Sequence, residues 1–453
     1  MKREKSLWIA LSMAVVFSLI AGSAGASPIR EATKKTVVEL WSTDNEEYRI
    51  QAYEKVADHF MSANPDVDVR IVPIDEAITT LLTAAARGAN RLPEIARVGV
   101  ERVAPYLADG ILDVDAATRV IKELGEATFP KGVLDLVRTP DGRYAAIPFD
   151  GWIQALWYRA DEFKKLNLAP PISWDDIQKA AEALKGRDGF RYALTLGTDP
   201  GQNYGAQVFE QIAMSNGAYP FDKAGKVAMN SPEMLEALTF YTSLQKYAAP
   251  GPNYWKQARE FYITGQSAML WYSTYVMDDL VGLQNGIEPT VKDLGTLTGF
   301  APMMTGKRGG SASYGQLVVM TIFKGTQVDG AVRLLKHMLT GQDYIDILFL
   351  SPNGKIPVRT TAVDAWSKND IFKRYPSEVI DAVVNGYNTM QRWAFAPQMG
   401  PVQRSVIGDM EGRLLIPQAV SSVVEGSMTP QQATDWLQQR VEELYAARQG
   451  EKK

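Results

Sequence analysis

The chain has 453 residues, of which 46% are hydrophobic and 22% are charged, and it contains no cysteine. Without disulfides a large buried core has to stabilise the fold, and at roughly 100–200 residues per domain the chain is long enough for two or three compact units. Its net charge of −4 argues against nucleic acid or an anionic membrane as the main partner.

The first 26 residues have the pattern of a secretory signal peptide. Lys2, Arg3 and Lys5 form a cationic start, residues 7–20 form an apolar run, and Ala24-Gly25-Ala26 provides small residues for cleavage. The apolar run is shorter than the ~20 residues of a membrane-spanning helix, which argues against a permanent anchor. Since there is no cysteine to carry a lipid, we expect a protein that is soluble in the periplasm after cleavage.

Strand and helix patterns alternate over the first part of the mature chain. The predicted elements are a strand over 37–41, a polar turn over 42–46, a helix over 50–60, a strand over 67–71, a helix over about 76–87, a strand over 94–98 and a helix over 101–108. This order predicts βαβ units and one half of an open, mostly parallel sheet.

The pattern changes around Pro148, where we place a boundary between two lobes. Strands are predicted over 144–148 and 155–158, and long helices follow. Ser173, Ser231 and Thr429 have the spacing of helix N-caps. At the end of the chain, residues 449–453 are expected to form a disordered tail.

The common catalytic signatures are absent from the sequence. It has no Walker loop, no G-x-G-x-x-G, no G-x-S-x-G and no H-E-x-x-H motif, and His59 and His337 are its only histidines. A zinc site or a histidine triad needs convergent partners that the sequence does not indicate, so we expect no metal and no cofactor. Acidic residues are plentiful, however, so a hydrolase that uses a pair of carboxylates stays open.

Aromatic residues recur beside polar residues near the predicted ends of elements. Four such clusters occur: Asp150-Gly151-Trp152, Gln202-Asn203-Tyr204-Gly205, Trp271-Tyr272-Ser273-Thr274-Tyr275 and Ser313-Tyr314-Gly315-Gln316. Aromatic faces stack on the C–H-rich faces of sugar rings, and Asp, Asn and Gln side chains hydrogen-bond hydroxyl groups. Because open α/β sheets bind ligands in the loops beyond their strand ends, these clusters predict a site for a polyhydroxylated ligand.

Several ordered motifs resemble those of the family 1 extracellular solute-binding proteins, the maltose-binding-protein-like receptors of carbohydrate ABC importers. The motifs are, in order, Asp141-Gly142-Arg143-Tyr144-Ala145-Ala146-Ile147-Pro148, Trp157-Tyr158 with Asp161 and Phe163, Pro170-Pro171-Ile172-Ser173-Trp174-Asp175, residues 261–269, and Asn353-Gly354-Lys355-Ile356-Pro357-Val358. Together they extend over almost the whole mature chain. Arg159 stands where the family often has Asn.

The resemblance implies an α/β, two-lobed periplasmic-binding-protein fold. Each lobe would be an open, mostly parallel sheet flanked by helices, with the ligand cleft at the hinge and three crossovers near Pro148, Gly299 and Gly354. The first lobe would comprise residues 27–148 and 299–353, and the second residues 149–298 and 354–448. Closure of the lobes on a sugar or sugar-like solute would be recognised by the permease of an ABC transporter, and the receptor would act as a monomer without enzymatic activity.

The family pattern also implies a set of ligand-binding residues. Asp44, Asn45 and Glu46 would hydrogen-bond hydroxyl groups from the first lobe, and aromatic rings would contribute from the second. The complete predicted set is Asp44, Asn45, Glu46, Glu101, Asp150, Trp152, Asn203, Tyr204, Trp271, Tyr272, Tyr275, Tyr314, Gly315, Arg359 and Arg392. Glu101 and Arg392 have a solvated surface as their alternative, because charged residues usually remain exposed unless they are paired.

Other functions share parts of this pattern. An exported carbohydrate-active hydrolase with a carboxylate pair would use the same aromatic and acidic residues. A receptor for a polyamine or an anion would keep the architecture, although the uncharged polar loops disfavour it. Arg359 or Arg392 in the cleft would favour an acidic sugar derivative.

Overall fold

The computed structural model describes residues 35–75, 77–86, 88, 91–187, 189–283, 287–325, 327–351 and 354–450, without the side chains of Tyr387 and Asn388. The signal peptide predicted over residues 1–26 lies outside the described residues, as do residues 451–453 of the predicted tail. None of the helices in these described ranges is both long and apolar enough to cross a membrane.

A mixed β-sheet of eleven strands runs through the described residues. The strands are β1 (Thr36–Ser42), β2 (Val67–Pro73), β3 (Ile95–Gly99), β4 (Ile147–Arg159), β5 (Tyr192–Leu194), β6 (Ser267–Ser273), β7 (Thr298–Ala301), β8 (Met303–Thr305), β9 (Ser311–Ile322), β10 (Ile356–Pro357) and β11 (Met390–Gln391). The main path has the order β2-β1-β3-β9-β4-β6-β5. β1 is parallel to β2 and β3, and β5 is parallel to β6, whereas β4 and β9 are antiparallel to each other.

Two hydrophobic cores pack against this sheet. The first core draws its buried side chains from residues 38–149 and 317–362, and the second core from residues 152–318 and 375–444. Helices of the first core are α1 (Glu47–Ala63), α2 (Ile78–Ala86), α3 (Val103–Ala108), α4 (Val114–Leu124), α5 (Lys131–Asp135), α13 (Val328–Met338), α14 (Gly341–Leu348) and α15 (Thr360–Ser367).

Helices of the second core are α6 (Ala160–Lys165), α7 (Trp174–Leu184), α8 (Tyr204–Ser215), α9 (Pro232–Ser243), α10 (Trp255–Ile263), α11 (Met277–Leu280), α12 (Leu294–Leu297), α16 (Ser377–Thr389), α17 (Pro401–Gly412), α18 (Leu415–Val424) and α19 (Pro430–Gly450). Short 3₁₀ helices are η1 (Val100–Arg102), η2 (Glu126–Thr128), η3 (Leu244–Tyr247), η4 (Thr274–Val276), η5 (Asp370–Arg374) and η6 (Trp393–Phe395).

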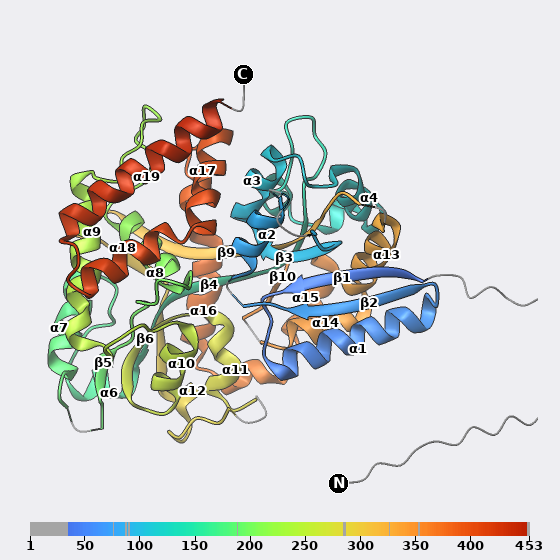
Figure 1. Cartoon of the computed structure of the whole chain (residues 1–453). Coiled ribbons are helices and arrows are strands. Elements are labelled where there is room, and N and C mark those ends of the chain that lie inside the picture. Colours follow the sequence, from blue (N-terminus) through green and yellow to red (C-terminus); the bar gives the residue numbers. More distant parts are fainter. Residues whose placement is uncertain are drawn as a thin grey trace, which may run out of the picture. The chain divides into compact units, whose positions relative to one another are not determined.

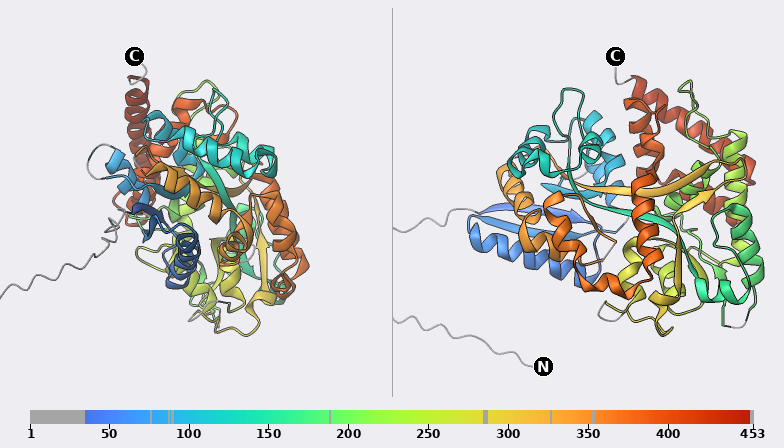
Figure 2. Two further views of the ribbon diagram at one scale, coloured as in Figure 1. Left: turned by 90° about the vertical axis from the view of Figure 1, so that its right-hand side faces the viewer. Right: turned by 180° about the vertical axis from the view of Figure 1, so that it is seen from behind.

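The long strands β4 and β9 connect the two cores. Figure 1 shows them passing from the side of β1, β2 and β3 to the side of β6. α16 packs on β4, β7 and β9, and Figure 2 shows it from behind as the orange helix that crosses these strands. Both cores therefore share the same hydrogen-bonded sheet.

The unit β1-α1-β2 follows the pattern predicted from the sequence. Val38 and Leu40 of β1 are fully buried, and α1 turns Tyr53 and Phe60 toward the same core. β2 pairs in parallel with β1 along the whole length of both strands. The polar residues after β1 are thereby left at the carboxyl end of the strand, where they begin the site.

The strand predicted over 155–158 lies within β4, whereas the strand predicted over 144–148 overlaps β4 only at Ile147 and Pro148. β4 continues past Pro148, with a shift in its register against β9 between Pro148 and Asp150. Asp150 and Trp152 therefore lie within the strand and not in a turn after it. The helix predicted over 101–108 is divided into η1 and α3.

The predicted helix starts at the three cap residues are confirmed. Ser173 accepts a hydrogen bond from the backbone N–H of Asp176, and Ser231 accepts one from Met234. Thr429 exchanges hydrogen bonds with Gln432 at the start of α19. This helix extends to Gly450, so the predicted tail does not begin at residue 449.

Candidate functional site

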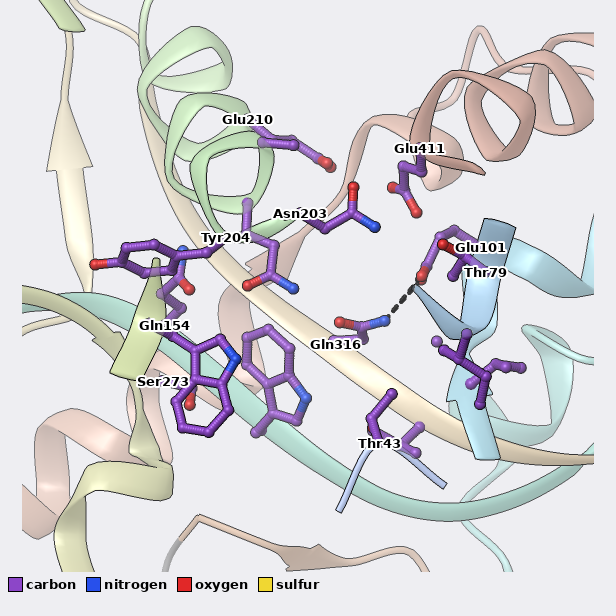
Figure 3. A pocket seen from close by; sticks show the side chains of 18 of the residues that line it. Thr43, Thr79, Glu101, Gln154, Asn203, Tyr204, Glu210, Ser273, Gln316 and Glu411 are labelled. Atoms are coloured by element: carbon purple, nitrogen blue, oxygen red, sulfur yellow. Dashed lines mark hydrogen bonds between the residues drawn. The ribbon is translucent and has the colours of Figure 1, made fainter. Parts of the chain in front are cut away.

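A cavity of about 170 Å³ is lined by residues from both cores (Figure 3). Its polar lining is Thr43, Asp44, Asn45, Glu46, Arg49, Asp75, Thr79, Arg97, Glu101, Gln154, Asn203, Gln207, Glu210, Ser273, Gln316, Arg392 and Glu411. Its aromatic lining is Trp152, Tyr204, Trp255, Tyr272, Tyr275, Tyr314 and Trp393. The carboxyl ends of β1 and β3, the faces of β4, β6 and β9, and the helices α8 and α17 supply most of these side chains.

Asp44, after β1, is surrounded by cations. It accepts hydrogen bonds from Arg49 Nη1 at 3.0 Å and from Lys355 Nζ at 2.7 Å, and Arg97 Nε lies 3.5 Å from its Oδ2. Burial disfavours the charged carboxylate, but these three neighbouring cations outweigh burial and hold the pKa of Asp44 well below its usual range. Asp44 is therefore an ionised acceptor whose charge is balanced by the protein itself.

Arg392 occupies a different part of the cavity and donates to three carboxylates. Its Nε donates to Glu210 at 2.9 Å, its Nη1 to Glu101 at 3.2 Å and its Nη2 to Glu411 at 2.9 Å. The amide of Gln316 also donates to Glu101, at 2.9 Å (dashed in Figure 3). Burial and the charge of Glu101 raise the pKa of Glu411 well above its usual range, although Arg392 acts in the opposite direction. Three carboxylates thus share one guanidinium.

Aromatic rings form part of the cavity wall. The ring centroid of Trp152 lies 5.9 Å from that of Tyr314 and 6.2 Å from that of Tyr275. The ring centroids of Tyr272 and Trp255 lie 6.4 Å apart, and the two rings are nearly edge to face. These rings offer flat apolar surfaces beside the charged groups, which suits a ligand with both C–H and polar faces.

Three amides of the lining, those of Asn45, Gln154 and Asn203, have a buried atom without a hydrogen-bond partner among the described residues. Gln154 is 1% exposed and Asn203 is 7% exposed, yet neither Gln154 Nε2 nor Asn203 Oδ1 forms a hydrogen bond with any of the described residues. Buried polar groups in proteins are almost always hydrogen-bonded. One atom is a donor and the other an acceptor, so a hydroxyl-bearing guest could satisfy both.

Metal binding finds no support in the described part of the chain, where no group of three or more His, Asp or Glu side chains is arranged to hold an ion. The side chains of the lining offer hydrogen bonding, charge pairing and ring stacking.

A family model described as bacterial extracellular solute-binding protein matches residues 44–343 of the chain. The chain belongs to this family. The resemblance found in the ordered sequence motifs is confirmed, and the match begins at Asp44, the first of the acidic residues that line the cavity.

This solute-binding protein is similar to one curated relative over 96% of its length. It is 28% identical over 444 residues to the putative ABC transporter periplasmic-binding protein YcjN of Escherichia coli (strain K12). The alignment covers 96% of this chain and 98% of the relative. Among solved structures, an ABC transporter solute-binding protein of Agrobacterium radiobacter K84 in complex with ribitol matches with a TM-score of 0.75 and 21% identity, over 91% of this chain and 99% of the other. Maltose-bound MalE3 of T. maritima matches with a TM-score of 0.73 and 19% identity, over 90% and 99%. These likenesses confirm the predicted two-lobed α/β fold.

Most of the site residues predicted from the sequence line the cavity of the solute-binding protein. Eleven of the fifteen do so: Asp44, Asn45, Glu46, Glu101, Trp152, Asn203, Tyr204, Tyr272, Tyr275, Tyr314 and Arg392. Glu101 and Arg392 are buried and paired, which differs from the solvated alternative. The structure brings the other four, Asp150, Trp271, Gly315 and Arg359, to places outside the lining.

Strand alternation accounts for Trp271 and Gly315. Successive residues of a strand point to opposite faces, so Tyr272 reaches the cavity while Trp271 is fully buried in the second core. In the same way Tyr314 faces the cavity and Gly315 faces away from it, where an added Cβ would lie 2.7 Å from Met390 Sδ. The sequence clusters had included both neighbours of each pair.

Asp150 and Arg359 are engaged elsewhere. Asp150 is fully buried and accepts hydrogen bonds from Arg97 Nη2 at 2.9 Å and from the hydroxyl of Tyr275 at 3.1 Å, so it positions two lining residues without reaching the cavity. Arg359 donates to the backbone oxygens of Leu339 and Leu124 at 2.8 and 3.0 Å. It thereby joins segments of the first core.

The predicted set of site residues left out Gln154 and Gln316, although Gln316 belongs to the cluster at residues 313–316 and a signal for both was present. Gln154 follows Trp152 by two residues on β4, and Gln316 follows Tyr314 by two residues on β9, so each shares a strand face with a predicted aromatic residue.

Glu210 and Glu411 were missed as well. Glu210 follows Asn203 by seven residues on α8, a spacing that puts both on one helical face. Glu411 had no comparable signal, because only the packing of α17 brings it to the cavity.

Proposed function

We propose that this solute-binding protein is exported to the periplasm, captures a carbohydrate or a small glycosylated solute in the cavity, and delivers it unaltered to the permease of an ABC importer. One observation supports this above all: aromatic rings and unpartnered amides face the same buried cavity. Rings stack on the C–H faces of sugars, and an amide donor and acceptor suit hydroxyl groups. Maltose and ribitol, the ligands in two structures of the same fold, are both polyhydroxylated.

The size of the cavity favours a short ligand. An engineered protein cavity of about 150 Å³ accepts a single benzene ring. The volume of about 170 Å³ is therefore suited to one sugar ring or one open-chain sugar alcohol in the arrangement seen here. We accordingly infer a ligand nearer in size to a monosaccharide than to a long oligosaccharide.

Closure of two lobes would explain how binding is signalled. We assign the lobes as predicted, with residues 27–148 and 299–353 in one and residues 149–298 and 354–448 in the other. The buried side chains favour crossovers between the lobes that lie somewhat later in the chain than Gly299 and Gly354. Residues 300–314 pack in the second core, and Val358 packs in the first. A ligand that contacts both lobes binds the closed arrangement more tightly, and this difference in affinity drives closure. One copy of the chain supplies every side chain needed, so we infer that a monomer acts as receptor.

Isothermal titration calorimetry with monosaccharides, sugar alcohols and disaccharides tests the receptor function. We expect saturable binding of at least one small member, and a smaller radius of gyration by X-ray scattering when that member saturates the protein. The bound compound, recovered after long incubation and examined by NMR, should be chemically unchanged. A cleaved product would instead support the carboxylate-pair hydrolase.

Trp152→Ala supplies the matched test of the cavity wall. Loss of ring stacking should weaken binding by about 1 kcal/mol, roughly a fivefold rise in Kd. Trp436→Ala removes the same side chain from α19, away from the cavity lining, and should leave Kd unchanged. Absence of saturable binding across the whole panel would overturn the proposed function.

A further inference from the structure

Negative charge is unevenly balanced along the cavity. Around Asp44 and Glu46 the carboxylates meet several cations, namely Arg49, Arg97, Arg259 and Lys355. Glu101, Glu210 and Glu411 instead share the single guanidinium of Arg392. We call these three carboxylates the acidic end of the cavity.

Glu411 is the carboxylate of the acidic end that is most open to a guest. Glu210 also accepts the backbone N–H of Trp393 at 2.6 Å, and Glu101 also accepts the amide of Gln316. Glu411 accepts from Arg392 through Oε1, and none of the described residues donates to its Oε2. Its side chain is 18% exposed, compared with 5% for each of the other two.

Asn203 points to a ligand at the same place independently of the carboxylates. Its buried Oδ1 accepts no hydrogen bond from the described residues. Asn203, Gln207 and Glu210 are spaced by four and three residues along α8 and all line the cavity. Figure 3 shows Asn203, Glu210 and Glu411 among the side chains that line the same cavity. An acceptor without a donor therefore lines the same cavity as carboxylates with spare acceptor capacity.

One further cation is close to the acidic end but does not neutralise it. Arg102, on η1, donates to the hydroxyl of Thr83 at 3.0 Å and lies 5.1 Å from the ring centre of Tyr106, outside the cavity lining. Burial and the charge of Glu101 still raise the pKa of Glu411, although Arg392 and Arg102 both oppose the rise. The acidic end is thus stabilised by added positive charge, either a proton or a cationic group.

We propose that the acidic end binds the ammonium group of an amine-bearing, polyhydroxylated ligand such as an amino sugar or an amino alditol, through Glu411, Glu101 and Asn203, a role that presupposes the receptor function proposed above. An ammonium group has three N–H donors and no acceptor, which matches these three acceptors. Glu101 and Glu411 both accept from the guanidinium of Arg392, so their carboxylates gather around the same group at the acidic end. The ring and hydroxyl groups of the ligand then face Trp152 and Gln154.

The same contact would link the two lobes. Glu101 lies on η1, which packs in the first core, and Glu411 lies on α17, which packs in the second. Three carboxylates that share one guanidinium still repel one another, whereas an added ammonium group attracts both Glu101 and Glu411. The acidic sugar derivative that Arg392 suggested from the sequence is disfavoured, because this guanidinium already donates to three carboxylates.

Calorimetry at pH 7 with matched ligands tests the assignment. Glucosamine is compared with glucose and N-acetylglucosamine, and 1-amino-1-deoxysorbitol is compared with sorbitol. In at least one set the amine should bind about tenfold or more tightly than its uncharged counterparts, as expected for hydrogen bonds to a charged group. Glu411→Gln should abolish most of that preference, while Glu443→Gln, the same change on the exposed face of α19, should preserve it.

Each other outcome overturns the assignment. If uncharged sugars or sugar alcohols bind at least as tightly as the amines, the acidic end does not select an ammonium group, while the receptor function stands. A preference for amines that survives Glu411→Gln would place the ammonium elsewhere in the cavity. The comparison of ligands on the wild-type protein decides the question even if Glu411→Gln fails to fold. Lack of binding by these ligands and by the wider panel would overturn the receptor function itself.

Discussion

Glu46 and Arg259 form an ion pair of 2.8 Å between segments that pack in different cores. Glu46 directly precedes α1, and Arg259 lies on α10. Both side chains are largely buried, and Arg259 Nη1 also lies 3.6 Å from Asp279 Oδ2. A buried contact of this kind links the two sides of the cavity in the arrangement seen here.

Arg259→Met should therefore weaken ligand binding by shifting the protein toward an open arrangement. Loss of a hydrogen bond between charged groups is worth about 1.5–3 kcal/mol, so we expect Kd to rise roughly tenfold or more. X-ray scattering should show a larger radius of gyration for the unliganded variant. Arg440→Met, which breaks an exposed pair with Glu443, serves as the control. An unchanged radius and an unchanged Kd in Arg259→Met would show that the pair does not restrain the lobes.

Trp271 and Tyr272 should respond differently to truncation, although they are neighbours on β6. Trp271→Ala leaves a hole in the second core, and we expect the free energy of unfolding to fall by about 3–5 kcal/mol with little change in Kd. Tyr272→Ala removes a ring of the cavity wall and should raise Kd. Urea denaturation and calorimetry on both variants measure the two quantities. A larger rise in Kd for Trp271→Ala than for Tyr272→Ala would contradict the placement of these side chains.

This pair also shows what the sequence could and could not predict. The unit β1-α1-β2 was predictable because its patterns are local: Val38 and Leu40 alternate along a strand, and the helical face of α1 repeats over several turns. The aromatic clusters are visible in the sequence, but we expect them in loops beyond strand ends, whereas Tyr272 and Tyr314 lie inside strands. The face of the sheet on which each ring lies depends on where its strand begins and ends. The clusters alone do not determine these positions.

The remaining site residues depend on contacts between distant segments. Arg359 follows a proline in a motif typical of the family, but its partners are the backbone oxygens of Leu124 and Leu339, which no local pattern indicates. Glu411 reaches the cavity only because α17 packs beside η1 and α3. Long-range packing of this kind cannot be derived from periodicity or residue spacing.

Arg392→Met should destabilise the protein strongly at neutral pH. The substitution leaves three carboxylates buried without their shared cation, which costs about 3–5 kcal/mol. Lower pH should restore part of the loss, because the unpaired carboxylates then take up protons. Arg308→Met is the matched control, since Arg308 also pairs with two glutamates, Glu233 and Glu236, but at an exposed position. Thermal unfolding from pH 5 to pH 8 should show a steeper decline for Arg392→Met than for either Arg308→Met or the wild type.

Asp278 and Asp279 on α11 should make the protein less stable as the pH rises above about 4. Burial raises the pKa of Asp278 from its ordinary value of 3.8 to about 6, and burial together with Asp278 raises the pKa of Asp279 well above its ordinary value. The folded protein therefore keeps protons that the unfolded chain releases near 3.8. The stabilisation that these retained protons provide is complete below pH 3.8, and for Asp278 it is lost as the pH rises through about 6. Asp44, whose pKa is lowered, acts with the opposite sign only at more acidic pH.

Asp279→Asn isolates the contribution of the pair. The variant cannot ionise at this position and removes the repulsion that acts on Asp278, so its melting temperature should fall less than that of the wild type between pH 4 and pH 7. Asp364→Asn makes the same change at an exposed position paired only with its helix neighbour Lys368, and its profile should follow the wild type. Parallel profiles for Asp279→Asn and the wild type would mean that both aspartates are fully ionised in the folded protein, with Arg49 and Arg259 compensating their burial.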